Sequence, residues 1–181
     1  NEQSVLLCLA NAIVAARNRD DLEAAIKDNL LELFAGKYFT LCITGDDKKT
    51  HAYFVHSRDN TIADQNIFSN IFHLKEAAGD DLFYSILSEQ MISIIRFSDV
   101  LKKAKKPSYI TSWQKAGIRQ MLAMPFVKSK NLQGVFCIYS EKERVISKEQ
   151  FNLFTSVTAL LNTGVSNIIS IEKTEQQLKE I

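Results

Sequence analysis

The sequence predicts an α+β domain built around an antiparallel sheet, and three observations support this fold class. Apolar residues recur every three or four positions near both ends of the chain, which is typical of amphipathic helices. In the interior they alternate with polar residues, which is typical of half-buried strands. The alternating segments come in pairs joined by short polar turns, and such hairpins pair their strands antiparallel. Helices before and after adjacent antiparallel strands indicate an α+β arrangement, not a doubly wound parallel sheet.

Two helices are expected before the first strand. The first carries one apolar stripe, formed by Val5, Leu6, Leu9, Ile13 and Ala16. Asp20 and Glu23 have the spacing of a capping box, so the second helix is expected to start at Asp20. Gly36 is expected to end it, because glycine readily adopts the left-handed conformation of a helix C-terminus.

Four strands follow from the period-two pattern. Tyr38–Thr44 and Thr50–Ser57 flank a polar turn and predict one hairpin. The segments 118–127 and 132–140 flank a second turn and predict another. In the last of these strands Phe136 and Ile138 suit the face covered by helices, which leaves the alternate residues for the opposite face.

The segment from 58 to 106 is the least regular part of the sequence. Short helices are expected at 67–74 and 82–87, and an edge strand at 91–97. After Pro107 a short helix is expected to run to Gly117. Long connections within compact domains are often functional loops or lids, so this segment is the predicted cover of a binding site.

The last helix is expected to start at Ser147, with Gln150 completing a capping box, and to run to the end of the chain. It carries a heptad-like seam with Gly164 and Glu175 as flaws. The seam consists of Val157, Leu161, Gly164, Ile168, Ile171, Glu175 and Leu178. Beyond Asn167 the seam has little of its own domain to pack against, which predicts pairing with another helix. The alternative is a frayed, solvated end.

Composition narrows the class of partner and the compartment. Lys plus Arg is 22 and Asp plus Glu is 21, so no net field favours nucleic acid or an anionic membrane. Three widely spaced cysteines predict neither disulfides nor a zinc site and favour the reducing cytoplasm. The longest near-apolar stretch, Leu6–Ala16, is too short to span a bilayer. His51, His56 and His73 lack the spacing of metal ligands, so no metal is expected.

Three segments together resemble the GAF domain family. Residues 113–126, WQKAGIRQMLAMPF, are similar to the family's short helix followed by G-I-x-x-x-L-x-x-P-L. LQGVFCIYS at 132–140 is similar to its x-x-G-V-L-x-L-x-S strand, and SKEQFNLF at 147–154 resembles the start of its last helix. The resemblance implies a GAF/PAS-like antiparallel sheet of five to six strands. Terminal helices would cover one face, and an irregular helical insert would enclose a pocket on the other.

The resemblance also implies a regulatory role. GAF domains occur in histidine kinases, transcription regulators and phytochromes, and most are not catalytic. We therefore expect one domain over 1–181, with 1–17 and 168–181 as helical extensions leading to neighbouring domains of a larger signalling protein. The Asn-Lys-Phe-Asp-Glu signature of cyclic-nucleotide-binding members and the Asp-Ile-Pro motif of bilin-binding members are absent. The ligand and any cofactor are therefore not named by the sequence.

Candidate ligand-binding residues follow from strand alternation together with the implied topology. If the first and last strands are neighbours, their outward side chains share one cavity with an aromatic wall and a charged residue. The set is Thr40, Cys42, Phe97, Asp99, Tyr109, Trp113, Cys137 and Tyr139. The alternative is ordinary: cysteines and aromatic residues in the core, and Asp99 as a surface charge.

The apolar faces of the two terminal helices predict a homodimer. Its expected interface is Leu6, Leu9, Ile13, Ile168, Ile171 and Leu178. Two further functions stay open. One is a dimerisation module with no ligand. The other is a free methionine sulfoxide reductase-like enzyme using Cys42 and Cys137, although no residue is assigned a catalytic role here.

Overall fold

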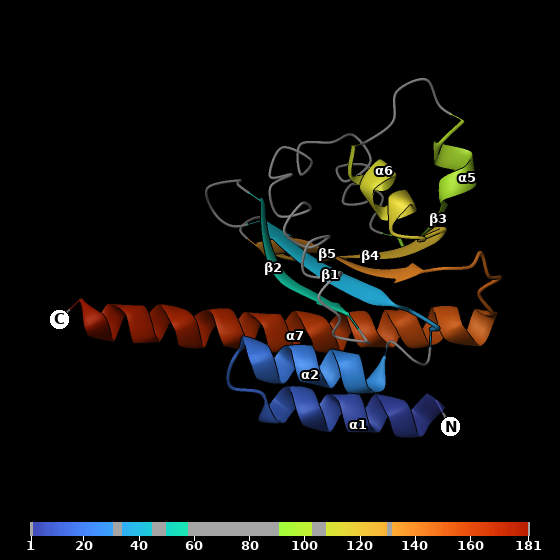
Figure 1. Ribbon diagram of the computed structural model, residues 1–181. Helices are drawn as coiled ribbons and strands as arrows, with labels where there is room; N and C mark the ends of the chain where they lie inside the picture. The colour runs from blue at the N-terminus through green and yellow to red at the C-terminus, as the bar shows by residue number, and fades with distance from the viewer. Residues whose placement is uncertain are drawn as a thin grey trace.

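A computed structural model describes residues 2–30, 34–44, 50–57, 91–102, 108–129 and 132–180 of the chain (Figure 1). Within these residues, helices lie at both ends of the chain, and the strands of one sheet lie between them together with two short helices. In chain order the elements are α1 (Glu2–Ala15), α2 (Arg19–Asn29), β1 (Tyr38–Thr44), β2 (Thr50–Ser57), β3 (Ser93–Arg96), α5 (Phe97–Val100), α6 (Ser108–Lys115), β4 (Gln120–Ser129), β5 (Leu132–Ser140) and α7 (Lys148–Lys179).

The described strands form one sheet in the order β2-β1-β5-β4-β3. Every neighbouring pair is antiparallel, which confirms the predicted α+β class with an antiparallel sheet. The register of β1 against β5 places Thr40 opposite Cys137 and Tyr38 opposite Tyr139. The expected edge strand ends at Arg96, because the chain enters α5 at Phe97.

The helices α1, α2 and α7 cover one face of the sheet, and α5 and α6 lie over the other (Figure 1). The core between the sheet and the three long helices contains Phe39 and Leu41 of β1 with Phe136 and Ile138 of β5. All four side chains are buried. The helix-packed face of both strands was therefore predicted correctly by the period-two pattern.

Gly164 of α7 is a packing residue. The seam pattern had marked it as a flaw, but it is buried at the place where α7 meets α1. A Cβ atom at this position would lie 2.7 Å from Cγ2 of Ile13 and 3.3 Å from Cδ1 of Leu22. The missing side chain therefore lets α1 and α2 approach α7 more closely than any other residue would allow.

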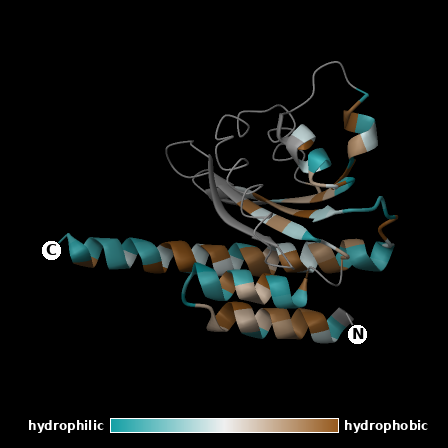
Figure 2. Ribbon diagram, viewed as in Figure 1, coloured by the Kyte–Doolittle hydropathy of each residue, from teal (hydrophilic) through white to brown (hydrophobic). Residues whose placement is uncertain are grey.

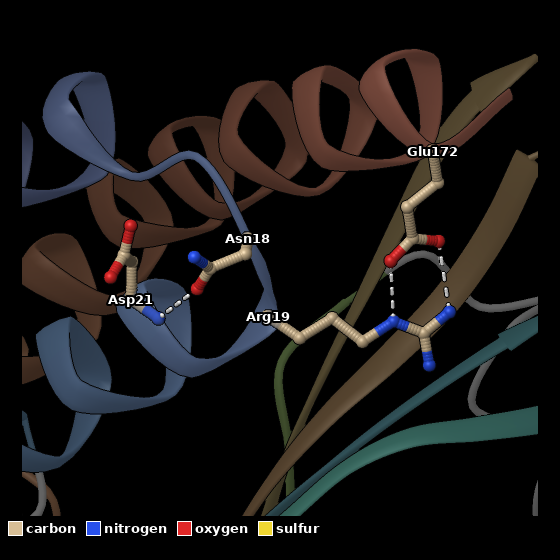
Figure 3. A network of polar contacts seen from close by, with 4 residues as sticks. All are labelled: Asn18, Arg19, Asp21 and Glu172. Atoms are coloured by element: carbon tan, nitrogen blue, oxygen red, sulfur yellow. Dashed lines mark hydrogen bonds and ion pairs between the residues drawn. The ribbon is translucent and has the colours of Figure 1, made fainter. Parts of the chain in front are cut away.

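The N-cap of α2 was predicted two residues too late in the chain. Asn18, not Asp20, is the N-cap: its side-chain oxygen accepts a hydrogen bond from the backbone N–H of Asp21 at 2.9 Å (Figure 3). The helix ends at Asn29, before Gly36, and Ala35 takes the left-handed conformation with φ of 51°. Aspartate and asparagine are both good caps, so spacing alone did not separate them.

The cap of α7 was predicted correctly. The backbone N–H of Gln150 donates to Oγ of Ser147 at 3.1 Å, and the Gln150 side chain accepts from the Ser147 backbone N–H at 3.1 Å. The helix that follows is long and apolar enough to cross a membrane by composition. Eight of its residues are buried inside this domain.

Two helices expected in the irregular segment, at 67–74 and 82–87, lie outside the described residues. Of the segment 58–106 that was predicted to cover a binding site, the structure describes only 91–102, which forms β3 and α5.

Glu23 on α2 gives the fold a pH-dependent component. Burial, aided by Asp20 and opposed by Arg19, raises the pKa of Glu23 from 4.5 to about 7. Stability associated with this carboxyl is thus complete below pH 4.5 and is lost as the pH rises towards 7, because the folded state holds the proton longer. The free energy of unfolding of Glu23→Gln should therefore be about 1 kcal/mol higher than that of the parent at pH 8. This value is reduced for solvent screening, because the side chain is only half-buried.

The measurement is urea unfolding of Glu23→Gln and the parent chain at pH 4.5 and pH 8. The two proteins should have similar stabilities at pH 4.5 and differ at pH 8. The difference between the two pH values is compared with that of Glu175→Gln, a change of the same kind at an exposed position near the end of α7. Equal stability of Glu23→Gln and parent at both pH values would contradict the shifted pKa.

Candidate functional site

The candidate site is the face of the sheet opposite α1, α2 and α7, which we call the distal face. Its side chains form a second core cluster, separate from the one under the terminal helices. The strands β1, β3, β4 and β5 contribute, together with α5 and α6. Its buried members are Tyr38, Ile95, Phe97, Val100, Ile110, Trp113, Ile118, Met121, Ala123, Val135, Cys137 and Tyr139.

Trp113 lies at the centre of the aromatic part of this cluster and is fully buried. Its ring stacks on Tyr139 with centroids 3.9 Å apart and an interplanar angle of 21°. Tyr38 lies beside it at 5.2 Å in a tilted arrangement. The three aromatic rings thus come from α6, β5 and β1 and join the short helix to the middle of the sheet.

The turn after α6 sets the position of Trp113. Gly117 adopts a φ of +89°, a conformation that favours glycine, and so ends the helix. The backbone N–H of Ile118 donates to the carbonyl of Trp113 at 3.0 Å. At the next step the N–H of Arg119 donates to the carbonyl of Ser140 at 2.9 Å, which starts the pairing of β4 with β5. The helix that presents Trp113 is therefore tied directly to the sheet.

The buried polar groups described on the distal face are uncharged. Oγ1 of Thr40 and the hydroxyl of Tyr139 lie 2.9 Å apart in a buried hydrogen bond. The thiol of Cys137 comes from the residue opposite Thr40 and is also buried. Two hydroxyls and a thiol thus provide uncharged hydrogen-bonding groups among aromatic rings.

The structure brings together five of the eight predicted ligand-binding residues, namely Thr40, Phe97, Trp113, Cys137 and Tyr139. Asp99 is exposed on α5 and does not join them, because α5 turns Phe97 and Val100 inwards instead. The side chains of Cys42 and Tyr109 lie outside what the structure describes.

Tyr38 was left out of the predicted ligand-binding set, although the strand alternation places it on the same face as Thr40. It lies two residues before Thr40 on β1, so the period-two alternation places both on the distal face. Its pairing with Tyr139 then brings it next to Trp113.

Polar contacts connect α5 and β4 to the segment between β5 and α7. Oγ of Ser98, next to the buried Phe97 on α5, donates to Oε1 of Glu143 at 2.7 Å. The buried Gln120 at the start of β4 accepts through Oε1 from the backbone N–H of Arg144 at 2.9 Å. Both acceptor and donor residues lie in the segment between β5 and α7. The segment that precedes α7 is therefore in contact with both α5 and β4.

The predicted dimer residues divide into three groups by burial. Leu9, Ile13 and Ile168 are buried in the core of this chain, so they serve packing within the protomer. Leu6 and Ile171 are half-buried. Leu178 is 66% exposed.

The sequence did not single out Leu7 and Val14, which are 63% and 72% exposed on α1. Figure 2 shows α1 coloured mostly as hydrophobic along its length. In the part of the chain that the structure describes, no group of three His, Cys, Asp or Glu side chains is placed to hold a metal ion.

Comparison with known proteins identifies the fold. No family model matches the sequence, and no curated protein matches it. Solved structures do match. CepR2 from Burkholderia cenocepacia, an N-acylhomoserine lactone-dependent transcription factor of the LuxR family, superposes with a TM-score of 0.70 at 9% identity, over 95% of this chain and 98% of that one. The fold is GAF-like.

Two GAF domains support that statement directly. The GAF domain of an Acinetobacter phosphoenolpyruvate-protein phosphotransferase matches with a TM-score of 0.67 at 8% identity, covering 95% of this chain and 97% of that one. The phycoerythrobilin-bound GAF domain of a cyanobacterial phytochrome matches with a TM-score of 0.63 at 11% identity, over 93% and 96% of the two chains. The GAF-like architecture therefore extends over almost the whole of this chain.

Proposed function

We propose that this GAF-like domain is a regulatory module that senses a small molecule on its distal face. The observation that carries the proposal is the buried Thr40–Tyr139 hydroxyl pair beside the Trp113 stack. Two structures with this fold are described as dependent on an acylhomoserine lactone and as bound to a bilin. Their likeness to this chain supports a ligand-binding role for the same kind of fold.

The chemistry of the described part of the distal face favours an uncharged ligand. The buried polar side chains described on this face are the hydroxyls of Thr40 and Tyr139 and the thiol of Cys137, and none of them carries a charge. A charged ligand group would need a paired counter-charge to offset its desolvation. Hydroxyl groups next to aromatic rings instead match a mostly apolar molecule with a hydrogen-bonding group.

The output of this module is proposed to pass through its terminal helices. The exposed Leu7 and Val14 on α1, with Ile171 and Leu178 near the end of α7, are the apolar residues left for a second copy. A homodimer in the cytoplasm, within a larger signalling protein such as a histidine kinase or transcription regulator, is the arrangement we propose. No catalytic role is proposed, and no binding of nucleic acid or membrane by this domain.

The tryptophan provides a direct test, because Trp113 is the only tryptophan in the chain. Uncharged amphiphiles, including acyl lactones of graded chain length, would be titrated while Trp113 fluorescence and thermal unfolding are followed. A ligand should change the fluorescence and raise the melting temperature in a saturable way. Tyr139→Phe should weaken its binding by about tenfold through loss of one hydrogen bond.

The control for this titration is Val145→Ala, since Val145 is exposed on the segment after β5. It should bind like the parent. Saturable binding that is equally strong in Tyr139→Phe would place the ligand elsewhere and overturn the proposed site.

A dimerisation module without a ligand is the second candidate. It is favoured by the close stack of Trp113 on Tyr139, because the two rings fill space that a ligand would otherwise occupy. Sedimentation of the chain with and without ligands separates the two functions. A stable dimer with no response of Trp113 to any uncharged amphiphile would support this candidate over sensing.

A further inference from the structure

The burial pattern of α7 shows where this helix leaves the body of the domain. Ile168 is its last fully buried residue, and every residue from Lys173 to Glu180 is exposed. Glu172 lies one turn after Ile168, on the same side of the helix, and is half-buried. The segment 169–180 is therefore an outgoing arm, and Glu172 marks its root.

At this root the arm is bound to α2 by a bidentate ion pair between Arg19 and Glu172. Nε of Arg19 lies 2.6 Å from Oε1 of Glu172, and Nη2 of Arg19 lies 2.9 Å from Oε2 (Figure 3). The residues are 153 positions apart in the sequence. Paired parallel hydrogen bonds of this kind fix orientation as well as distance, because the guanidinium and the carboxylate are both planar.

The arginine side of the pair starts from an ordered turn. Arg19 is the first residue of α2 and follows the N-cap Asn18. Asp21 accepts from the backbone N–H of Arg17 at 3.0 Å through its side chain and donates its own N–H to Asn18. These bonds define the path between α1 and α2 and so fix the point from which Arg19 reaches Glu172.

The pair is suited to a reversible contact. Its side chains are 40% and 38% exposed, and ion pairs at that exposure contribute little to global stability. Within the described ranges it is also the one polar side-chain contact between the arm and the rest of the domain. Loss of the pair would therefore release the arm while leaving the core under Gly164 in place.

We propose that Arg19–Glu172 is a latch that sets the direction and order of the outgoing arm of α7, and that opening it is the step by which the α1–α2 pair controls this arm. The latch itself rests on contacts within the chain. Only its use in signalling rests on the proposed sensory function.

Hydrogen exchange of residues 169–179 tests the latch in the whole chain. Glu172→Gln and Arg19→Gln should each speed amide exchange of the arm by about two- to fivefold, as expected for a half-exposed pair. The double variant should exchange no faster than either single variant, because both remove the same interaction. Exchange in β5 and the unfolding midpoint should stay close to those of the parent.

Glu175→Gln, one turn further along the arm and exposed, is the matched control and should leave exchange unchanged. Sodium chloride at about 1 M should speed exchange in the parent but not in the double variant. Unchanged exchange in both single variants, or additive effects in the double variant, would overturn the latch. These outcomes do not depend on a ligand, so failure of the latch and failure of sensing are distinguishable.

Discussion

Trp113→Ala is expected to lower the free energy of unfolding by about 3 to 5 kcal/mol, the usual loss for a buried tryptophan. Trp113 is fully buried, and the substitution removes its stack on Tyr139 and its contact with Tyr38. A cavity would remain, because α6 is held to β4 by the Gly117 turn and cannot simply collapse inwards. Urea unfolding followed by circular dichroism is the measurement, since the variant has no tryptophan to follow.

Trp113→Phe keeps one ring of the stack and should cost less than half as much. Met91→Ala is a matched control at an exposed site just before β3, and its stability should lie within about 0.5 kcal/mol of the parent. A loss below about 1 kcal/mol in Trp113→Ala would show that the distal face is not packed around this ring.

Gly164→Val is expected to lower the free energy of unfolding by about 3 kcal/mol. The first added carbon would already lie 2.7 Å from Cγ2 of Ile13, a methyl group next to the main chain of α1. Ile13 is β-branched and has one strongly preferred rotamer in a helix, so its methyl group cannot move aside easily. The two helices would have to separate. Thermal and urea unfolding measure the loss.

Two further variants identify the cause of that loss. Ile13→Ala removes the opposing methyl group, so Gly164→Ala should cost less in an Ile13→Ala background than in the parent. Gly117→Ala adds a Cβ atom that meets nothing within 4 Å, so it tests conformational strain alone and should cost about 1 kcal/mol. Additive effects of the changes at Gly164 and Ile13 would rule out a steric clash between them.

The sequence allowed the sheet faces to be predicted because strand periodicity is a local property. Phe136 and Ile138 do pack under the helices, while Cys137 and Tyr139 point to the distal face. The Ser147 cap followed from local chemistry in the same way. Gly164 was interpreted as a flaw because a heptad pattern expects a large apolar residue at each seam position. In the structure α1 packs closely against α7 at this position, and a larger residue would not fit.

The grouping of the candidate residues in space was predicted in part for a similar reason. Alternation selects which residues share a face, but it does not say whether their side chains surround a space or fill it. Trp113 and Tyr139 were correctly placed together, yet their 3.9 Å stack depends on the exact path of α6 over the sheet. Asp99 was expected at the site from its position after a strand, and one turn of helix was enough to direct it to solvent.

The continuity of α7 has a mechanical consequence. About 11 residues separate Ile168, the last fully buried residue of α7, from Lys179, which corresponds to a rod of about 16 Å at 1.5 Å per residue. A tilt of about 10° at Ile168 would displace the tip by roughly 3 Å. A rearrangement too small to disturb the packing around Gly164 would thus be large enough, at the far end of the rod, to change which side chains of an attached helix meet.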